Sequence, residues 1–211
     1  MNREVAGIIL AGGQSRRMGG GDKSLLALGS GRLLDHVIER FSPQVGPLAL
    51  SANGDPARLT DISLPVLADT VKGFAGPLAG ILAGLEWVFG NTNCQVLVTA
   101  AGDTPFLPED LVERLVDAAG ARPDSIAVAC SDGKRHPTFA LWPTGCRDAL
   151  RHFLVEEDNR RVSAFIDRHG SVDVEFPMLL KSGPQPIDPF FNINMPGDLA
   201  HAERLLQSMK S

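Results

Sequence analysis

An apolar run that leads directly into a glycine-rich, basic stretch is the feature of this sequence that most constrains its fold. Val5 to Leu10 reads V-A-G-I-I-L, and the segment from Leu10 to Lys23 continues as L-A-G-G-Q-S-R-R-M-G-G-G-D-K. A short run that is apolar at every position is typical of a strand buried on both faces. Glycines just beyond such a strand let backbone N–H groups approach an anion closely. The segment therefore predicts a phosphate-binding loop at the end of a central strand.

The cations of this loop indicate which anion it binds. Arg16, Arg17 and Lys23 supply positive charge that balances a triphosphate. The loop is not a Walker A motif, because Asp22 stands where that motif has glycine, and it lacks the dinucleotide pattern G-x-G-x-x-G at the required place. Glycines alone are a weak signal, since turns use them constantly. Loop, cations and strand-end position together predict a nucleoside triphosphate site.

Strand-like and helical stretches alternate along the rest of the chain. Strands are expected at 48–52, 65–67, 95–101, 125–131, 136–142, 172–176 and 190–194, and helices at 33–41, 77–89, 108–119, 147–169 and 197–209. Asp132-Gly133 is a turn signal that predicts a hairpin between two of the strands. The alternation predicts a three-layer α/β/α sandwich with a mostly parallel, mixed sheet. No repeat or long linker divides the chain, so residues 1–211 are expected to form one domain.

Composition excludes several classes of protein. The chain is 44% hydrophobic and 21% charged, which is ordinary for a globular protein. No apolar run approaches the roughly 20 residues that span a bilayer, and the N-terminus lacks the apolar core of a signal peptide. A cytoplasmic location without membrane contact is therefore expected. A net charge of −5, without a basic stretch carrying aromatics, argues against a nucleic-acid partner. Cys94, Cys130 and Cys146 are expected to be reduced, buried thiols.

Asp103 follows the apolar strand 95–101 directly. Open α/β folds place their ligands at this carboxyl edge of the sheet. A lone carboxylate suits Mg²⁺, which keeps several waters and takes further ligands from substrate phosphates. Without a cation between them, Asp103 and a triphosphate would repel, so the position predicts a bridging metal. The alternative is a turn or helix cap before Pro105. Asp69 has a similar alternative, because Asp69-Thr70 can cap a turn.

The loop resembles the L-A-G-G-x-x-x-R-M-G-x-x-K signature of nucleotidyltransferases, and the longer match is similar to the molybdenum cofactor guanylyltransferase family. The first motif alone indicates only the superfamily, whereas the ordered set of later motifs is more specific and extends over nearly the whole chain. These later motifs are Leu67-Ala68-Asp69, Gly76-Pro77-Leu78-Ala79-Gly80, Gly102-Asp103-Thr104-Pro105, His136-Pro137-Thr138, Arg160-Arg161-Val162 and Phe191-Asn192-Ile193-Asn194-Met195-Pro196.

The resemblance implies a Rossmann-like nucleotide-diphosphate-binding fold. It implies transfer of GMP from GTP to the terminal phosphate of molybdopterin, with Mg²⁺ as cofactor and pyrophosphate as second product. Other molybdenum cofactor proteins or apo-molybdoenzymes are further candidate partners. It implies that Leu10, Ala11 and Gly12 line the guanine and ribose, that Lys23 contacts phosphate, that Asp69 contacts the nucleotide and that Asp103 ligates Mg²⁺. The further candidate nucleotide-binding residues are Gly13, Ser51, Asn53 and Asp103, and the candidate catalytic cations are Arg17 and Lys23.

The sequence leaves the roles of two pairs of polar residues open. Ser51 and Asn53 alternate with Ala52, so both side chains should leave their strand on one face. The family usually has Asn where Ser51 stands, and Asn53 is the alternative hydrogen-bonding residue for guanine or ribose. Asn192 and Asn194 share one face of the last predicted strand. They are candidates for holding the pterin or completing the metal shell, against strand-end capping.

Three functions are compatible with these motifs. The first is guanylyl transfer by direct displacement, because no nucleophilic Ser, Cys or His stands out and phosphoryl-type transfer needs mainly positioning and charge neutralisation. The second is a related cytidylyl or sugar-phosphate nucleotidyltransferase. Cytidylyl enzymes tend to read L-A-A-G, whereas Gly12 leaves room for a purine. The third is a non-catalytic carrier of the molybdenum cofactor. Lys23 and Asp103 are both present, which favours an enzyme.

Overall fold

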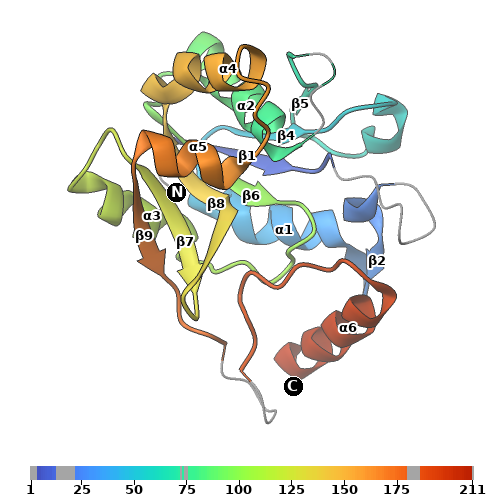
Figure 1. Ribbon diagram of the computed structural model, residues 1–211. Helices are drawn as coiled ribbons and strands as arrows, with labels where there is room; N and C mark the ends of the chain where they lie inside the picture. The colour runs from blue at the N-terminus through green and yellow to red at the C-terminus, as the bar shows by residue number, and fades with distance from the viewer. Residues whose placement is uncertain (1–3, 13–21, 72, 74–75, 180–185, 211) are drawn as a thin grey trace.

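The computed structural model describes residues 4–12, 22–71, 73, 76–179 and 186–210. A seven-stranded sheet with the order β5-β4-β1-β6-β8-β7-β9 forms its centre (Figure 1). All neighbouring strands are parallel except β8, which is antiparallel to both β6 and β7. The strands are β1 Val5–Leu10, β4 Leu48–Ser51, β5 Val66–Leu67, β6 Val96–Ala101, β7 Ile126–Ser131, β8 Lys134–Pro143 and β9 Ser171–Glu175. The predicted mixed, mostly parallel sheet is confirmed.

Helices cover both faces of this sheet, as the three-layer prediction requires. The helices are α1 Leu33–Phe41, α2 Pro77–Asn91, α3 Leu111–Gly120, α4 Arg147–Val155, α5 Val162–His169 and α6 Pro196–Lys210. Ile9 packs in one buried cluster with α1 and α3, and its neighbour Ile8 packs in another with α2, α4 and α5. Successive side chains of a strand point to opposite faces, so β1 is apolar throughout because both faces are covered.

Helix α2 lies very close to the sheet. A Cβ added at Gly84 would lie 2.8 Å from Ile8 Cδ1 and 2.8 Å from Leu97 Cδ2, closer than carbon atoms pack. The absence of a side chain at Gly84 therefore allows this close approach. Pro77 occupies the first helical position, where its missing N–H costs nothing.

The hairpin between β7 and β8 turns at Asp132 (φ 49°) and Gly133 (φ 71°). Two successive residues with positive φ form the turn whose twist matches the flanking strands, as the Asp-Gly pair predicted. A second, two-stranded sheet, β2 Ala27–Leu28 with β3 Gly31–Arg32, was not expected. The short 3₁₀ helices are η1 Lys23–Leu25, η2 Ser42–Gln44, η3 Pro56–Leu59 and η4 Thr144–Cys146.

The structure corrects three predicted elements. The helix expected at 108–119 begins only at Leu111. The helix expected at 147–169 is divided into α4 and α5, because Asp158 between them has φ 47°, which an α-helix cannot include. The strand expected at 190–194 does not form. Its backbone crosses the strand ends, where Ile193 N–H donates to the Asp103 carbonyl at 3.2 Å, and it does not run along a sheet edge.

Two predictions from composition can be compared with the described residues. Cys94, Cys130 and Cys146 are buried thiols, as expected. Burial raises the pKa of the Cys146 thiol to about 12, so this group stays protonated at neutral pH. Among the helices described, none has the length and apolar character that crossing a membrane requires.

Candidate nucleotide-binding site

A cavity of about 270 Å³ opens at the carboxyl ends of β1, β4 and β6. The chain passes from β1 outward to β4 and β5, and then returns to β6 on the other side of β1. The cavity thus lies at the point where the strand order reverses, which is where open α/β sheets bind ligands. Its lining residues are Leu10, Gly12, Ser51, Asn53, Asp69, Gly76, Pro77, Gly80, Ala101, Asp103, Thr138 and Asn192.

Most of the candidate site residues selected from the sequence therefore line this one cavity. Ala11 does not line the cavity, because its side chain is buried in the core beside α1, and its N–H donates to the Ser51 carbonyl at 2.9 Å. Gly13 and Arg17 lie outside the described residues. The sequence reasoning missed Gly80 and Thr138 as lining residues, although both belong to motifs that it had singled out.

Lys23 lies at the edge of the cavity and joins two chain segments that are far apart in sequence. Its Nζ donates to Asp103 Oδ2 at 2.5 Å and to Asn194 Oδ1 at 2.5 Å. The side chains of Lys23 and Asp103 are only 12% and 22% exposed, so this ion pair is sheltered from water. Charge interactions are stronger in such surroundings than at an open surface. A cation and a carboxylate thus meet beside the predicted triphosphate site.

Asn192 reaches the same region, although it is not on a strand. Asn192 and Asn194 are exposed, whereas Ile193 between them is buried, so the two amides do lie on one side, as predicted. Asn192 Oδ1 accepts a hydrogen bond from the Thr104 hydroxyl. Thr104 is fully buried directly after Asp103, so this bond anchors the segment at the cavity.

Asn53 and Asp69 form the opposite wall of the cavity. Asn53 Nδ2 donates to Asp69 Oδ2 at 2.8 Å, and Asp69 N–H donates to Asn53 Oδ1 at 2.9 Å. Partial burial raises the pKa of Asp69, and the hydrogen bond from Asn53 offsets part of that rise. The Asp69 side chain therefore binds Asn53, which follows β4 and precedes Asp69 by 16 residues in the sequence. This long-range contact differs from the turn cap that is the alternative role of Asp69.

Ser51 and Gly80 form the floor of the cavity. Ser51 is 4% exposed, and within the described residues its hydroxyl makes no hydrogen bond. Buried hydroxyls are normally paired, because an unpaired one loses its hydration without compensation. A Cβ at Gly80 would lie 2.5 Å from Ser51 Oγ, so only glycine lets α2 begin this close to β4. The Ser51 hydroxyl is available to a bound ligand.

His136 lies in a buried network that fixes the segment leading to Asn192. The Ser131 hydroxyl donates to Asp188 Oδ1 at 2.8 Å and lies 2.7 Å from His136 Nε2. The hydroxyl has one hydrogen and the carboxylate only accepts, so Nε2 must donate to Ser131. Asp188 Oδ1 also accepts from Phe190 N–H at 2.8 Å, and the Phe190 ring packs on His136 with centroids 4.6 Å apart.

This network predicts a pH dependence of stability. Burial lowers the pKa of His136, and the nearby charge of Asp188 offsets part of that shift. The unfolded chain, with an ordinary His pKa of about 6.5, then binds more protons than the folded protein below that pH. The contribution of His136 to the free energy of unfolding is therefore complete above about pH 6.5 and is lost as the pH falls toward the lowered pKa.

We expect urea unfolding between about pH 8 and about pH 5.5 to show this loss in the native protein. The variant His136→Gln should lack that part of the pH dependence, because it removes the titrating group. Ser131, Asp188, Lys134 and Glu175 remain in both proteins, so the difference between the two curves isolates His136. Parallel curves would contradict the prediction.

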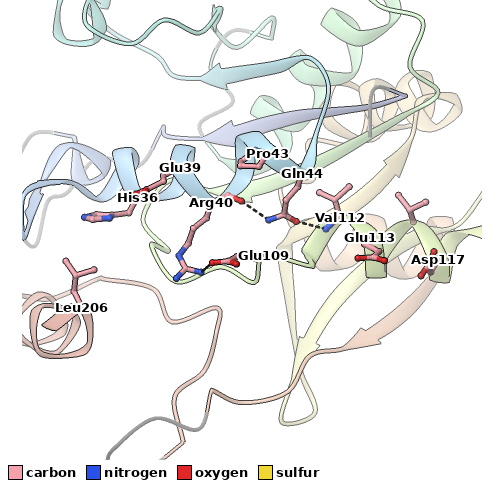
Figure 2. A pocket seen from close by; sticks show the side chains of 11 residues that line it. His36, Glu39, Arg40, Pro43, Gln44, Glu109, Val112, Glu113, Asp117 and Leu206 are labelled. Atoms are coloured by element: carbon pink, nitrogen blue, oxygen red, sulfur yellow. Dashed lines mark hydrogen bonds and ion pairs between the residues drawn. The ribbon is translucent and has the colours of Figure 1, made fainter. Parts of the chain in front are cut away.

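A separate hollow of about 770 Å³ lies between α1, α3 and α6 (Figure 2). None of the residues selected from the sequence lines it. Gln44 ties its walls together, donating from Nε2 to the Arg40 and Pro108 carbonyls at 2.8 and 2.9 Å. Its Oε1 accepts from Val112 N–H at 3.0 Å, which satisfies a donor in the first turn of α3. These bonds brace the connection between β6 and α3.

A mixed sheet with a polar cavity where the strand order reverses is typical of nucleotide-binding α/β proteins, and comparison with known proteins narrows this class. Residues 7–172 match the model of the MobA-like NTP transferase domain. A molybdenum cofactor guanylyltransferase of Mesorhizobium japonicum is 70% identical over 211 residues, covering 100% of both chains. One from a Bradyrhizobium species is 50% identical, covering 95% of this chain and 92% of the relative. The chain belongs to the molybdenum cofactor guanylyltransferase family.

A solved structure agrees with this fold. Molybdopterin-guanine dinucleotide biosynthesis protein A from Archaeoglobus fulgidus superposes with a TM-score of 0.72 at 24% identity. The match covers 96% of this chain and 98% of that one. At this identity the likeness bears on the fold alone, and it supports the Rossmann-like architecture.

Proposed function

We propose that this protein transfers GMP from GTP to the terminal phosphate of molybdopterin, forming molybdopterin guanine dinucleotide and pyrophosphate. One observation carries the proposal. Lys23, Asp103 and Asn194 converge at the edge of a cavity built from the ends of β1, β4 and β6. The names of the relatives at 70% and 50% identity support the choice of substrates.

The arrangement favours direct displacement. An oxygen of the molybdopterin phosphate attacks the α-phosphorus of GTP, and the bond from that phosphorus to the oxygen bridging to the β-phosphate breaks. Lys23 lies where it can neutralise charge that grows on the phosphates. A covalent enzyme intermediate needs a nucleophile beside a base. The Ser51 hydroxyl lines the cavity but has no hydrogen-bonded base within the described residues.

Oxygen donors beside the cavity fit Mg²⁺. Asp103 Oδ2 and Asn194 Oδ1 already converge on one positive group, the Lys23 ammonium. The described residues hold no cluster of three or more His, Cys, Asp or Glu side chains. A site with one carboxylate suits Mg²⁺, which takes its other ligands from water and phosphate. We propose Asp103 as its protein ligand, with Asn194 as a second oxygen donor; when bound, the ion would screen phosphate charge.

Lys23 supplies positive charge at the position where the sequence led us to expect a metal. From the sequence, a metal was the only cation expected between Asp103 and the triphosphate. Lys23 lies 2.5 Å from Asp103 and supplies part of that positive charge itself. The need for charge compensation is therefore shared between Lys23 and the proposed ion.

The base preference is the most direct test of the function. With Mg²⁺, molybdopterin and each of the four nucleoside triphosphates, we expect pyrophosphate release with GTP far above that with CTP or ATP. Gly12→Ala should lower the use of GTP, because a methyl group would crowd the purine. Nothing lies within 4 Å of a Cβ built at Gly12, so the fold and melting temperature should not change.

Two outcomes would contradict this assignment. Comparable turnover with CTP would favour the cytidylyl alternative, and unchanged GTP affinity in Gly12→Ala would remove the steric argument. A protein that binds molybdopterin but releases no pyrophosphate with any nucleotide would be a carrier.

A further inference from the structure

Arg58, in the last turn of η3, donates hydrogen bonds to three separate acceptors beside the cavity. Its Nε donates to Asp22 Oδ2 at 3.2 Å, its Nη1 to the Asp55 carbonyl at 2.7 Å, and its Nη2 to the Asn53 carbonyl at 2.6 Å. The planar guanidinium has a fixed fork of donors, so these three acceptors are held in one geometry. The side chain of Asp22 is only 7% exposed, so its carboxylate depends on these partners.

Asp22 connects Arg58 to the start of η1, and thus to Lys23. While Oδ2 accepts from Arg58, Oδ1 accepts from Ser24 N–H at 3.1 Å and from the Ser24 hydroxyl at 2.7 Å. Asp22 is thereby the N-cap of η1, whose first residue is Lys23. The direction in which the Lys23 side chain leaves the backbone is set by this cap.

Asp22 and Lys23 consequently form ion pairs on opposite sides of β1. Asp22 pairs with Arg58 on the β4 side, and Lys23 pairs with Asp103 at the end of β6. On the β4 side the same guanidinium holds the backbone of Asn53, whose amide pairs with Asp69. Arg58 is therefore linked both to the cavity wall at Asn53 and to the cation at Lys23.

We propose that Arg58 is a positioning residue for the nucleotide, holding Asn53 and, through Asp22, Lys23 at a fixed separation before the ligand arrives. This inference rests on the proposed function, in which the base and ribose meet the Asn53 wall and the phosphates meet Lys23. Groups that are already ordered lose less conformational entropy when a ligand binds, so their affinity is higher. Arg58 acts without contacting the reacting atoms.

The test compares Arg58→Gln, Asp22→Asn and the double variant, with Arg40→Gln as the matched control. Arg40 also donates to a carbonyl and to a carboxylate, those of Leu107 and Glu109, and its side chain is 22% exposed against 26% for Arg58. GTP affinity is measured by calorimetry without molybdopterin, together with KM for GTP, kcat and the melting temperature. Arg58→Lys serves as the conservative variant if Arg58→Gln fails to fold.

We expect Arg58→Gln to weaken GTP binding by about tenfold or more, the scale of a lost charge-assisted hydrogen bond. KM for GTP should rise more than kcat falls, Arg58→Lys should recover part of the affinity, and Arg40→Gln should bind GTP normally. In the Asp22→Asn background Arg58→Gln should have a smaller further effect, because the route through Asp22 is already broken and only the contact with Asn53 remains to be lost.

Normal GTP affinity in Arg58→Gln, with only a lower melting temperature, would overturn the inference. If Arg58→Gln does not fold, fully normal affinity in Arg58→Lys would overturn it, because a lysine cannot hold the three acceptors in one geometry. Fully additive effects of the Asp22 and Arg58 substitutions would overturn the route through Asp22. A native protein that binds no GTP at all would instead overturn the proposed function, and this inference with it.

Discussion

Asp103→Asn should nearly abolish pyrophosphate release while the protein remains folded. The substitution keeps the size and most of the hydrogen bonding of the side chain, but removes the charge that pairs with Lys23 and that we propose binds Mg²⁺. We expect turnover to fall by about 10²-fold or more, the scale of a lost electrostatic group in a catalytic site. Calorimetry of GTP binding at several Mg²⁺ concentrations should show weak binding with little dependence on the metal.

The structure indicates that this variant will fold. The segment carrying Asn192 is held by the backbone carbonyl of Asp103 and by the Thr104 hydroxyl, and neither contact needs the carboxylate. Asp117→Asn, which removes one exposed charge from α3 beside the hollow of Figure 2, is the matched control and should behave as the native protein. Unchanged Mg²⁺ dependence in Asp103→Asn would show that this residue is not the metal ligand.

Lys23→Ala is expected to lower turnover by about 10²-fold or more, because it removes the preorganised cation that we propose neutralises the phosphates. It also leaves the carboxylate of Asp103 without its partner, so GTP binding should weaken as well. The melting temperature should fall only modestly, because Lys23 lies outside the apolar clusters that stabilise the fold. Single-turnover measurements would separate the loss in the chemical step from the loss in binding.

The double variant Lys23→Ala/Asp103→Asn sharpens this prediction. The two side chains form an ion pair with each other and, in the proposed mechanism, act on the same phosphates, so their effects should be far from additive. We expect the double variant to lose little more activity than the worse single variant. Normal turnover in Lys23→Ala would mean that the loop has a structural role only.

The sequence could predict much of the cavity, because strand ends define it. Leu10, Ser51 and Asp103 each stand at or just past an apolar strand. The carboxyl ends of parallel strands meet at one edge of a sheet, so these residues had to converge once the strands were recognised. Gly80 was missed as a lining residue. Small residues at helical spacing indicate close packing against a sheet, but they do not indicate that Gly80 meets Ser51 at the end of β4.

Local patterns determined many of the elements of this protein: the two-faced burial of β1, the Asp132-Gly133 turn and the start of α2 at Pro77 all follow from the identity and spacing of nearby residues. Only the tertiary structure decided that Lys23 meets Asn194 across 171 residues, and that Asp188 meets Ser131 across 57. Asn194 reaches Lys23 from a segment that is not a strand. The physical reason is range: dihedral preferences and hydrophobic periodicity act over a few residues, whereas these contacts exist only after the sheet has formed and the chain has packed across its edge.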